Sequence, residues 1–423
     1  MKRFKEPLKT CLLLLLTASA VFMAVRGGFF GALFPLHPQA SAAPTAAPEA
    51  YPAAALPAAA AVTGPGGLRC GVKYDASALS RLAEGFSAAL AEALGSAETP
   101  VSLEEGEWRS RLRGESLYLD YGFPLPLSAM AAWVGVSADR MGDGTASALL
   151  LDGGAEGCVR LGFRSGDGSF CTCDTAASWA TLRRQLGDYR PNGAVFAFEL
   201  DRLRDCEPYL LVLEQLPELW AAQSEEVREE AEGAFGEFFG IKLAAQNRYA
   251  EADGTLVYPG EAGALRLTGD GRISYAASAS ALTASAAAED RIEAARRLLE
   301  AVHAPWAGDE GLVLTGLRRG EDGSLLLMFS YAVNGVTVEQ DEGPAATAEW
   351  KADGQAELTL RPLRFRRTKE AEGLLPEKQA AAAAGSLYKG AEARLVLQLQ
   401  GVDRFTPAWV VAVDGRILWT QDD

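Results

Sequence analysis

The 423-residue sequence predicts an α+β protein with one N-terminal transmembrane helix, an Ala/Pro-rich tether and two mixed α/β extracytoplasmic domains with largely antiparallel sheets. Three observations support this fold class. A basic N-terminus precedes a long apolar run, an Ala- and Pro-rich stretch follows it, and short strand patterns joined by Asp-Gly turns then alternate with a few amphipathic helices. The expected segments are a cytoplasmic N-terminus (1–9), a membrane anchor (10–34), a linker (35–67), an N-terminal α+β domain (68–245) and a C-terminal α+β domain (246–423).

The membrane anchor is expected from the apolar run between Thr10 and Phe34. Four basic residues against one acidic residue precede the run, and they hold that end in the cytoplasm by the positive-inside rule. The expected localisation is therefore the cell membrane, with a single pass and with the bulk of the chain outside. A cleaved secretory signal is the alternative, since small residues at Ala18–Ala20 and at Ala40–Ala42 could serve a signal peptidase. Both interpretations export the remainder.

The linker is expected from composition. Between Pro35 and Gly66, 20 of 32 residues are Ala or Pro, and repeated Pro prevents a long helix. Such a segment behaves as a semi-extended tether.

The charge of the exported part limits its partners. The chain carries a net charge of −16, and because residues 1–34 carry +4, the rest carries −20. This balance argues against nucleic acid and anionic headgroups as partners of the exported part.

The first exported block predicts strands and helices in irregular order. A strand at 68–74 precedes a helix at 77–94, for which Asp75 or Ser77 is the expected N-cap. The remaining expected strands are 116–121, 148–152, 159–163, 170–173, 195–200 and 209–213, and the remaining helices are 127–134, 176–186 and 225–239. The glutamates of the last helix are expected to form a solvated face.

The second block predicts strands gathered around two helices. The helices are expected at 288–302 and 376–387, and the strands at 256–258, 264–267, 272–276, 312–317, 324–331, 335–339, 347–351, 356–365, 393–400, 408–413 and 416–419. The Asp-Gly pairs at Asp143, Asp167, Asp253, Asp270, Asp322, Asp353 and Asp414 are expected to form hairpin turns rather than calcium loops.

Five cysteines lie in the exported part: Cys70, Cys158, Cys171, Cys173 and Cys206. An odd number leaves at least one thiol unpaired. Three alternatives stay open at this point: unpaired, partly buried thiols; a disulfide from Cys171 or Cys173 to Cys158 or Cys206; or a four-thiolate zinc site.

No catalytic, cofactor-binding or metal-ligating residue is assigned from the sequence. His303, one of two histidines, is expected to be a helix C-terminal residue. Ser386 and Lys389 match the Ser-X-X-Lys pattern of penicillin-binding enzymes, but the Ser-Asp-Asn and Lys-Thr-Gly elements of those enzymes are absent from the sequence. We therefore expect a protein without enzymatic activity and without a cofactor.

The order of segments resembles that of the YycH and YycI family of extracytoplasmic regulators. Residues 246–423 carry most of the likeness: Tyr249 followed by Asp253-Gly254, then Leu265-Arg266-Leu267, Gly271–Tyr275 and Pro407–Val410. The resemblance implies a membrane-anchored, non-enzymatic protein that contacts a sensor histidine kinase, adjusts two-component signal transduction, and pairs with a related regulator or a second copy of itself.

Two other function classes stay open. Strand-rich exported domains in a chain with eight tryptophans also suit a module that binds cell-wall glycans or peptides. An unrecognised envelope hydrolase is the third alternative, although no carboxylate pair can be nominated for it among 56 acidic residues.

Overall fold

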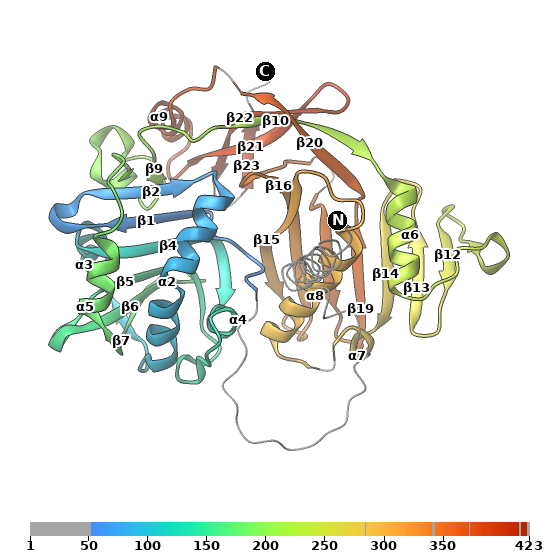
Figure 1. Ribbon diagram of the computed structural model, residues 1–423, viewed down its shortest axis with the longest axis horizontal. Helices are drawn as coiled ribbons and strands as arrows, with labels where there is room; N and C mark the ends of the chain where they lie inside the picture. The colour runs from blue at the N-terminus through green and yellow to red at the C-terminus, as the bar shows by residue number, and fades with distance from the viewer. Residues whose placement is uncertain (1–51, 284, 341–342, 372, 414–415, 421–423) are drawn as a thin grey trace, which may run out of the picture. The chain divides into compact units, whose positions relative to one another are not determined.

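The computed structural model describes residues 52–283, 285–340, 343–371, 373–413 and 416–420 (Figure 1). The predicted transmembrane helix (10–34) and the start of the predicted linker lie outside these ranges. In the part of the chain that the structure describes, no helix is both long enough and apolar enough to cross a bilayer. The described residues belong to one compact unit.

The first half of the chain forms a twisted antiparallel sheet with the strand order β2-β1-β4-β5-β6-β7-β3 (Figure 1). Its strands are β1 (Ala59–Thr63), β2 (Arg69–Lys73), β3 (Val101–Leu103), β4 (Ser116–Pro126), β5 (Thr145–Gly153), β6 (Cys158–Ser165) and β7 (Phe170–Ser178).

Both faces of this sheet are covered, because apolar side chains alternate between two cores along each central strand. Leu149 and Leu151 of β5 pack in the larger core, whereas Leu150 packs in the smaller one. Three helices contribute to the larger core: α2 (Ala76–Ser96), α4 (Leu127–Trp133) and α5 (Trp179–Leu186). On the opposite face, α3 (Glu105–Arg113) and the short strands β8 (Val195–Phe196) and β9 (Leu211–Val212) close the smaller core.

A longer antiparallel sheet follows, with the order β11-β12-β13-β14-β19-β18-β16-β15 and with β17 beside β16. Along β16 the residues alternate between buried and half-buried, so that one face lies on a core that includes α8. The bounds are β11 (Tyr249–Ala250), β12 (Leu256–Pro259), β13 (Gly263–Leu267), β14 (Ile273–Ser278), α7 (Ala279–Leu282), α8 (Ala288–His303), β15 (Glu310–Arg319), β16 (Leu325–Val333), β17 (Val336–Thr337), β18 (Ala346–Trp350) and β19 (Gln355–Leu360).

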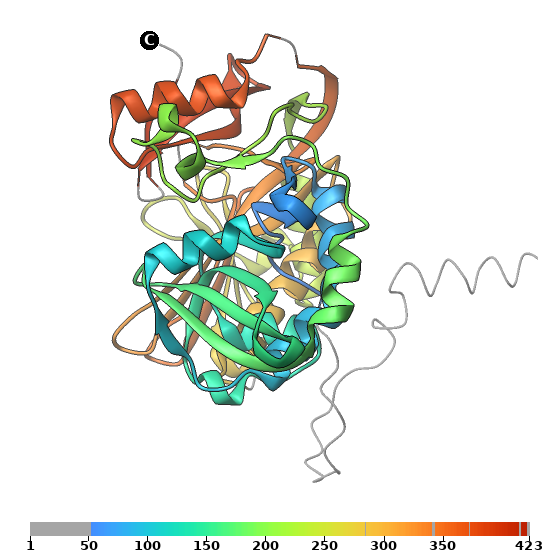
Figure 2. The ribbon, with the colours of Figure 1, turned by 90° about the vertical axis from the view of Figure 1, so that its left-hand side faces the viewer.

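A further antiparallel sheet combines strands from both halves of the chain, with the order β20-β10-β22-β21 and with β23 beside β22. The strands are β10 (Trp220–Glu226), β20 (Leu363–Glu370), β21 (Glu392–Gln400), β22 (Arg404–Val413) and β23 (Arg416–Thr420). Helix α6 (Arg228–Phe238) follows β10, and α9 (Glu377–Leu387) packs on β21. Figure 2 shows α9 beside the segment that carries β8 and β9.

The predicted α+β class with antiparallel sheets is confirmed. Strong periodicity identified α2, α8 and α9, and Asp75 is the N-cap of α2, because its Oδ1 accepts a hydrogen bond from Ala78 N at 2.9 Å. The pairing of β10 also accounts for Glu225 and Glu226, which were expected in a helix but end a strand.

The linker prediction (35–67) extends too far. Ala59–Thr63 form β1, a strand that is buried at every residue and that lies between β2 and β4. The reason is that four consecutive alanines carry no alternation of hydrophobicity, so a buried strand of small residues has the composition of a tether.

The expected boundary between 68–245 and 246–423 does not match a division of the fold either. Strand β10 was expected on the N-terminal side, yet it pairs with β20 and β22 from the C-terminal side. Sequence patterns report local periodicity and carry no information on which distant strand becomes a partner.

Candidate functional site

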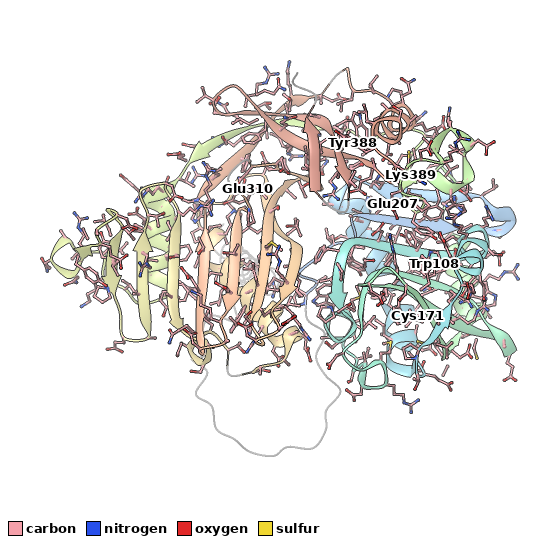
Figure 3. The ribbon with its side chains drawn as sticks, turned by 180° about the vertical axis from the view of Figure 1, so that it is seen from behind. Trp108, Cys171, Glu207, Glu310, Tyr388 and Lys389 are labelled. Carbon is pink, nitrogen blue, oxygen red and sulfur yellow. The ribbon has the colours of Figure 1, made fainter. Side chains whose placement is uncertain are left out.

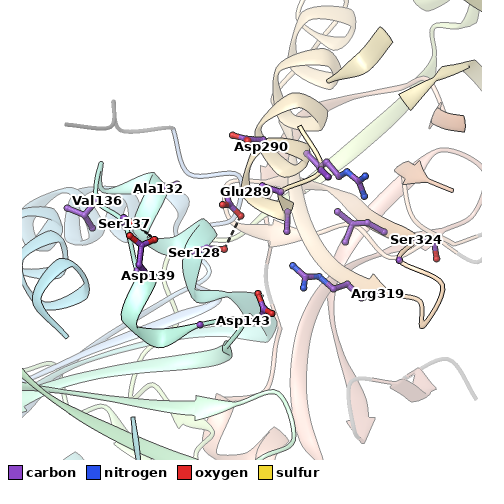
Figure 4. Close-up of a pocket in the computed structure, with 18 residues that line it drawn as sticks. Ser128, Ala132, Val136, Ser137, Asp139, Asp143, Glu289, Asp290, Arg319 and Ser324 are labelled. Atoms are coloured by element: carbon purple, nitrogen blue, oxygen red, sulfur yellow. Dashed lines mark hydrogen bonds between the residues drawn. The ribbon is translucent and has the colours of Figure 1, made fainter. Parts of the chain in front are cut away.

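A cleft of about 920 Å³ lies between α4 and α8, and we call it the α4–α8 cleft (Figure 4). Its walls come from segments about 150 residues apart in the sequence. The residues that line it are Ser128, Ala132, Val136, Ser137, Ala138, Asp139, Gly142, Asp143, Ala286, Ala287, Ala288, Glu289, Asp290, Arg291, Arg319, Gly323, Ser324 and Leu325.

The first wall consists of α4 and the loop that connects it to β5. Gly135 and Gly142 bound the loop with φ values of 73° and 58°, which residues other than glycine rarely adopt. Within the loop, Ala138 and Met141 are buried, and the hydroxyl of Ser137 donates to the carboxylate of Asp139. A second cavity of about 370 Å³ lies between this loop and the end of α2. The loop therefore separates two cavities.

The second wall consists of the first turn of α8 and the turn between β15 and β16. Glu289 and Asp290 occupy that first turn, where negative charge interacts favourably with the helix dipole. In the β15–β16 turn, Asp322 Oδ1 accepts a hydrogen bond from Ser324 N at 3.0 Å, and Gly323 has φ 82°. This turn places Arg319 and Ser324 at the edge of the cleft (Figure 4).

One hydrogen bond that crosses between the walls joins Ser128 Oγ to Glu289 Oε2 at 3.0 Å. The cleft presents four carboxylates, two guanidinium groups and three serine hydroxyls. Such a lining can hold a polar or charged ligand by ion pairs and hydrogen bonds.

The two halves of the chain are held together elsewhere by a buried ionic network. Lys73 Nζ lies 2.6 Å from Glu377 Oε1 and donates to the carbonyl of Leu211 at 2.9 Å. Tyr74 Oη donates to the same carboxylate at 3.2 Å, and Leu213 N donates to Glu377 Oε2 at 2.8 Å. Burial alone would lower the pKa of Lys73, but the Glu377 carboxylate holds it above its ordinary value. The network attaches α9 to β2.

Sequence reasoning missed both the cleft and this network. A signal for the network exists in Lys73, which occupies an inward position of the alternating strand β2. For the cleft the only signal was Asp143, and it was expected in a hairpin. The structure places Asp143 instead in the loop between α4 and β5, whereas Asp167, Asp253, Asp270, Asp322 and Asp353 do lie in hairpin turns. Asp414 lies outside the described residues.

His303 is the last residue of α8, as predicted, and it is buried. Its Nε2 lies 3.0 Å from Glu310 Oε1, and its ring packs edge-on against Trp306 (Figure 3 labels Glu310). Burial alone would raise the pKa of Glu310, but hydrogen bonds with His303 and from the backbone N–H groups of Gly308 and Phe365 hold it below its ordinary value. These contacts fix the end of α8 to β15 and β20.

The Ser-X-X-Lys match does not form the geometry that penicillin-binding enzymes use. Ser386 lies in the last turn of α9 and donates to the carbonyl of Ala383 at 2.7 Å, whereas α9 ends at Leu387. Lys389 is therefore beyond the helix, and it is exposed (Figure 3).

The structure has free thiols at Cys70, Cys158, Cys171, Cys173 and Cys206, which matches the first of the three alternatives. Cys173 and Cys206 are buried, and Cys70, Cys158 and Cys171 are half-buried. Burial raises the pKa of Cys173 to about 12. Among the described residues, no group of three or more His, Cys, Asp and Glu side chains is arranged to hold a metal ion.

The glutamates of the 225–239 segment are mostly exposed, and some pair with arginines of β20. Arg364 Nη1 lies 3.3 Å from Glu225 and Arg364 Nη2 lies 3.7 Å from Glu230.

Comparison with known proteins gives no match to a protein-family model, to a curated protein or to a solved structure.

Proposed function

We propose that this chain is a membrane-anchored, non-enzymatic regulator that modulates a sensor histidine kinase by protein–protein contact outside the membrane. The class of partner comes from the resemblance to the YycH and YycI family and from the basic and apolar N-terminal segment. The observation that carries the proposal is the α4–α8 cleft, because its walls come from two distant parts of the chain and a molecule bound there contacts both.

The cleft walls come from parts of the chain that are far apart in the sequence, and the hydrogen bond from Ser128 Oγ to Glu289 Oε2 joins them. A molecule bound in the cleft contacts both walls, so it can favour one arrangement of the lining side chains and loops over another. A regulator with two such arrangements can favour one conformation of a kinase that contacts it.

A glycan-binding module is supported less well. Among the described residues that line the cleft, none is aromatic. Stacking on sugar rings uses aromatic side chains, so this lining suits charged groups better than saccharide faces.

The partner is tested by cross-linking the full chain in membranes of its native host and identifying the proteins that co-purify with it. We expect enrichment of a sensor histidine kinase over a sample without cross-linker. Recovery of no kinase would contradict the proposal.

The role of the cleft is tested by filling it. Ser324→Trp places an indole in the cleft, and we expect it to shift the output of the kinase by several-fold. Ser87→Trp is the matched control, because Ser87 is exposed on α2 away from the lining residues. Equal output from the two variants and the wild type would show that the cleft has no part in regulation.

A further inference from the structure

Each wall of the α4–α8 cleft carries a charged side chain that forms no ion pair with a described residue, and the two charges are of opposite sign. Asp143 belongs to the α4–β5 loop and Arg319 to the end of β15, and Figure 4 shows the Arg319 side chain directed toward Asp143 across the opening. Within the described ranges of the chain, neither side chain forms an ion pair or a hydrogen bond. By contrast, Glu289 already accepts a hydrogen bond from Ser128.

We propose that the α4–α8 cleft binds a short zwitterionic peptide, with the ammonium group of the peptide at Asp139 and Asp143 and its carboxylate at Arg319. This inference rests on the proposed function, because it names the ligand to which the regulator responds.

The chemistry of the lining favours this ligand class over a purely anionic or purely cationic one. A guanidinium group is suited to a carboxylate, and carboxylates pair with an ammonium group. The hydroxyl of Ser324 can donate to or accept from peptide groups between the two charged ends, and the hydroxyl of Ser137, which donates to Asp139, can still accept a hydrogen bond. The cavity of about 920 Å³ also lies within the range of roughly 300 to 1,000 Å³ that is usual for small-ligand sites.

A peptide that spans from Asp143 to Arg319 interacts with both walls at once, so it stabilises the arrangement of the two walls in which both of its ends are paired. The loop from Gly135 to Asp143 has room to adjust to the ligand, because a cavity lies on each side of it and glycines with positive φ bound it.

The test uses isothermal titration calorimetry on the purified full-length chain with trialanine as the probe. Four forms are compared: free trialanine, the N-acetylated form, the C-amidated form, and the form with both ends blocked. We expect the free form to bind best and each blocking group to weaken binding by roughly tenfold.

Single substitutions assign each end of the probe. The Arg319→Gln variant should bind free and C-amidated trialanine equally, but it should still bind free trialanine better than the N-acetylated form. In Asp143→Asn the preference for a free amino group should shrink while the preference for a free carboxylate remains. Arg318→Gln and Asp188→Asn are the matched controls, because both residues are exposed and neither lines the cleft. They should behave as the wild type does.

Equal binding of the four forms, or no binding of free trialanine at millimolar concentration, would overturn the zwitterionic peptide as the ligand. This result is separate from failure of the proposed function. If Ser324→Trp changes kinase output while trialanine does not bind, the ligand class is wrong and the regulator remains. If trialanine binds as expected but kinase output is unaffected by Ser324→Trp, the ligand site remains and the regulatory role is wrong.

Discussion

At the scale of single residues, the Lys73–Glu377 pair is a buried ion pair that joins two segments about 300 residues apart in the sequence. The side chains of the two residues are 7% and 0% exposed, and the Glu377 carboxylate accepts three hydrogen bonds, from Lys73 Nζ, Tyr74 Oη and Leu213 N. Removal of one partner leaves the other charge buried and unpaired. The network thus links two distant parts of the chain through two buried charges, each of which compensates the other.

We predict that Lys73→Met lowers the free energy of unfolding by about 3 to 5 kcal/mol, because the Glu377 charge is then uncompensated. Lys351→Met is the matched control. Lys351 pairs with Glu357 at 3.0 Å on the surface, where the loss of an ion pair costs below about 1 kcal/mol. Thermal denaturation of both variants measures the difference. Similar melting temperatures would mean that the buried pair is not stabilising the attachment of α9.

Asp120 contributes to the pH dependence of folding stability with a sign opposite to that of most carboxylates. Burial raises the pKa of Asp120 from 3.8 to about 6, and the Glu392 carboxylate adds to the rise. A hydrogen bond from Gly122 N at 2.8 Å, the charge of Arg164 and the hydroxyl of Tyr118 work in the other direction. Between pH 4 and pH 6 the folded state holds this proton more tightly than the unfolded state does.

We therefore predict that Asp120 reduces stability as the pH rises from about 4 to about 6, by up to about 3 kcal/mol in total. Asp120→Asn removes this contribution, so the variant should gain melting temperature relative to the wild type between pH 4.5 and pH 7. Asp188→Asn, at an exposed position, serves as the control. A constant difference between Asp120→Asn and wild type across this range would be inconsistent with the raised pKa.

The role of a residue can be predicted from the sequence when that role depends on residues close to it in the chain. The Asp75 cap and the position of His303 at a helix end depend on a few neighbouring residues. Asp143 and Arg319 meet at one cleft only because two sheets place them there, and nothing near either residue in the sequence records this.

At the scale of elements, β1 shows that part of the predicted linker belongs to the folded structure. It pairs on one side with β2 and on the other with β4, so its removal would expose unpaired backbone groups on two strands in the middle of a sheet. Periodicity predicted the elements with strong apolar stripes, such as α2 and α8, and failed for β1, where small side chains fill a narrow space. It also failed for α3, whose apolar side chains are only Trp108 and Leu112.

We predict that a fragment of residues 52–423 folds and that a fragment of residues 68–423 does not, because the second fragment lacks β1. Circular dichroism and limited proteolysis distinguish the two outcomes. In the full chain, Ala61→Asp should be strongly destabilising, since Ala61 is 0% exposed, whereas Ala53→Asp at an exposed position should have little effect. A cooperative melt of fragment 68–423 would assign β1 to the linker after all.

At the scale of the whole molecule, the two halves of the chain depend on each other. Strand β10 comes from the first half and lies between β20 and β22 of the second half. Beyond β10, Phe239 stacks on Tyr275 with ring centroids 3.6 Å apart. The second half in turn supplies Glu377 to Lys73. The length of the chain beyond the linker and a second block of strands from Tyr249 onward predict two domains, but the pairing of distant strands joins them into one folding unit.

We predict that the fragments 52–245 and 246–423 do not fold when they are expressed separately. Fragment 246–423 lacks the strand that separates β20 from β22, and its Glu377 carboxylate has no lysine partner. Fragment 52–245 exposes β10, an unpaired strand with an apolar start, and should aggregate. Co-expression should restore a soluble complex, because the two fragments together contain every pairing partner. Chemical denaturation of each fragment measures this. A cooperative transition in the isolated 246–423 fragment would show that β10 is an addition to a domain that is stable without it.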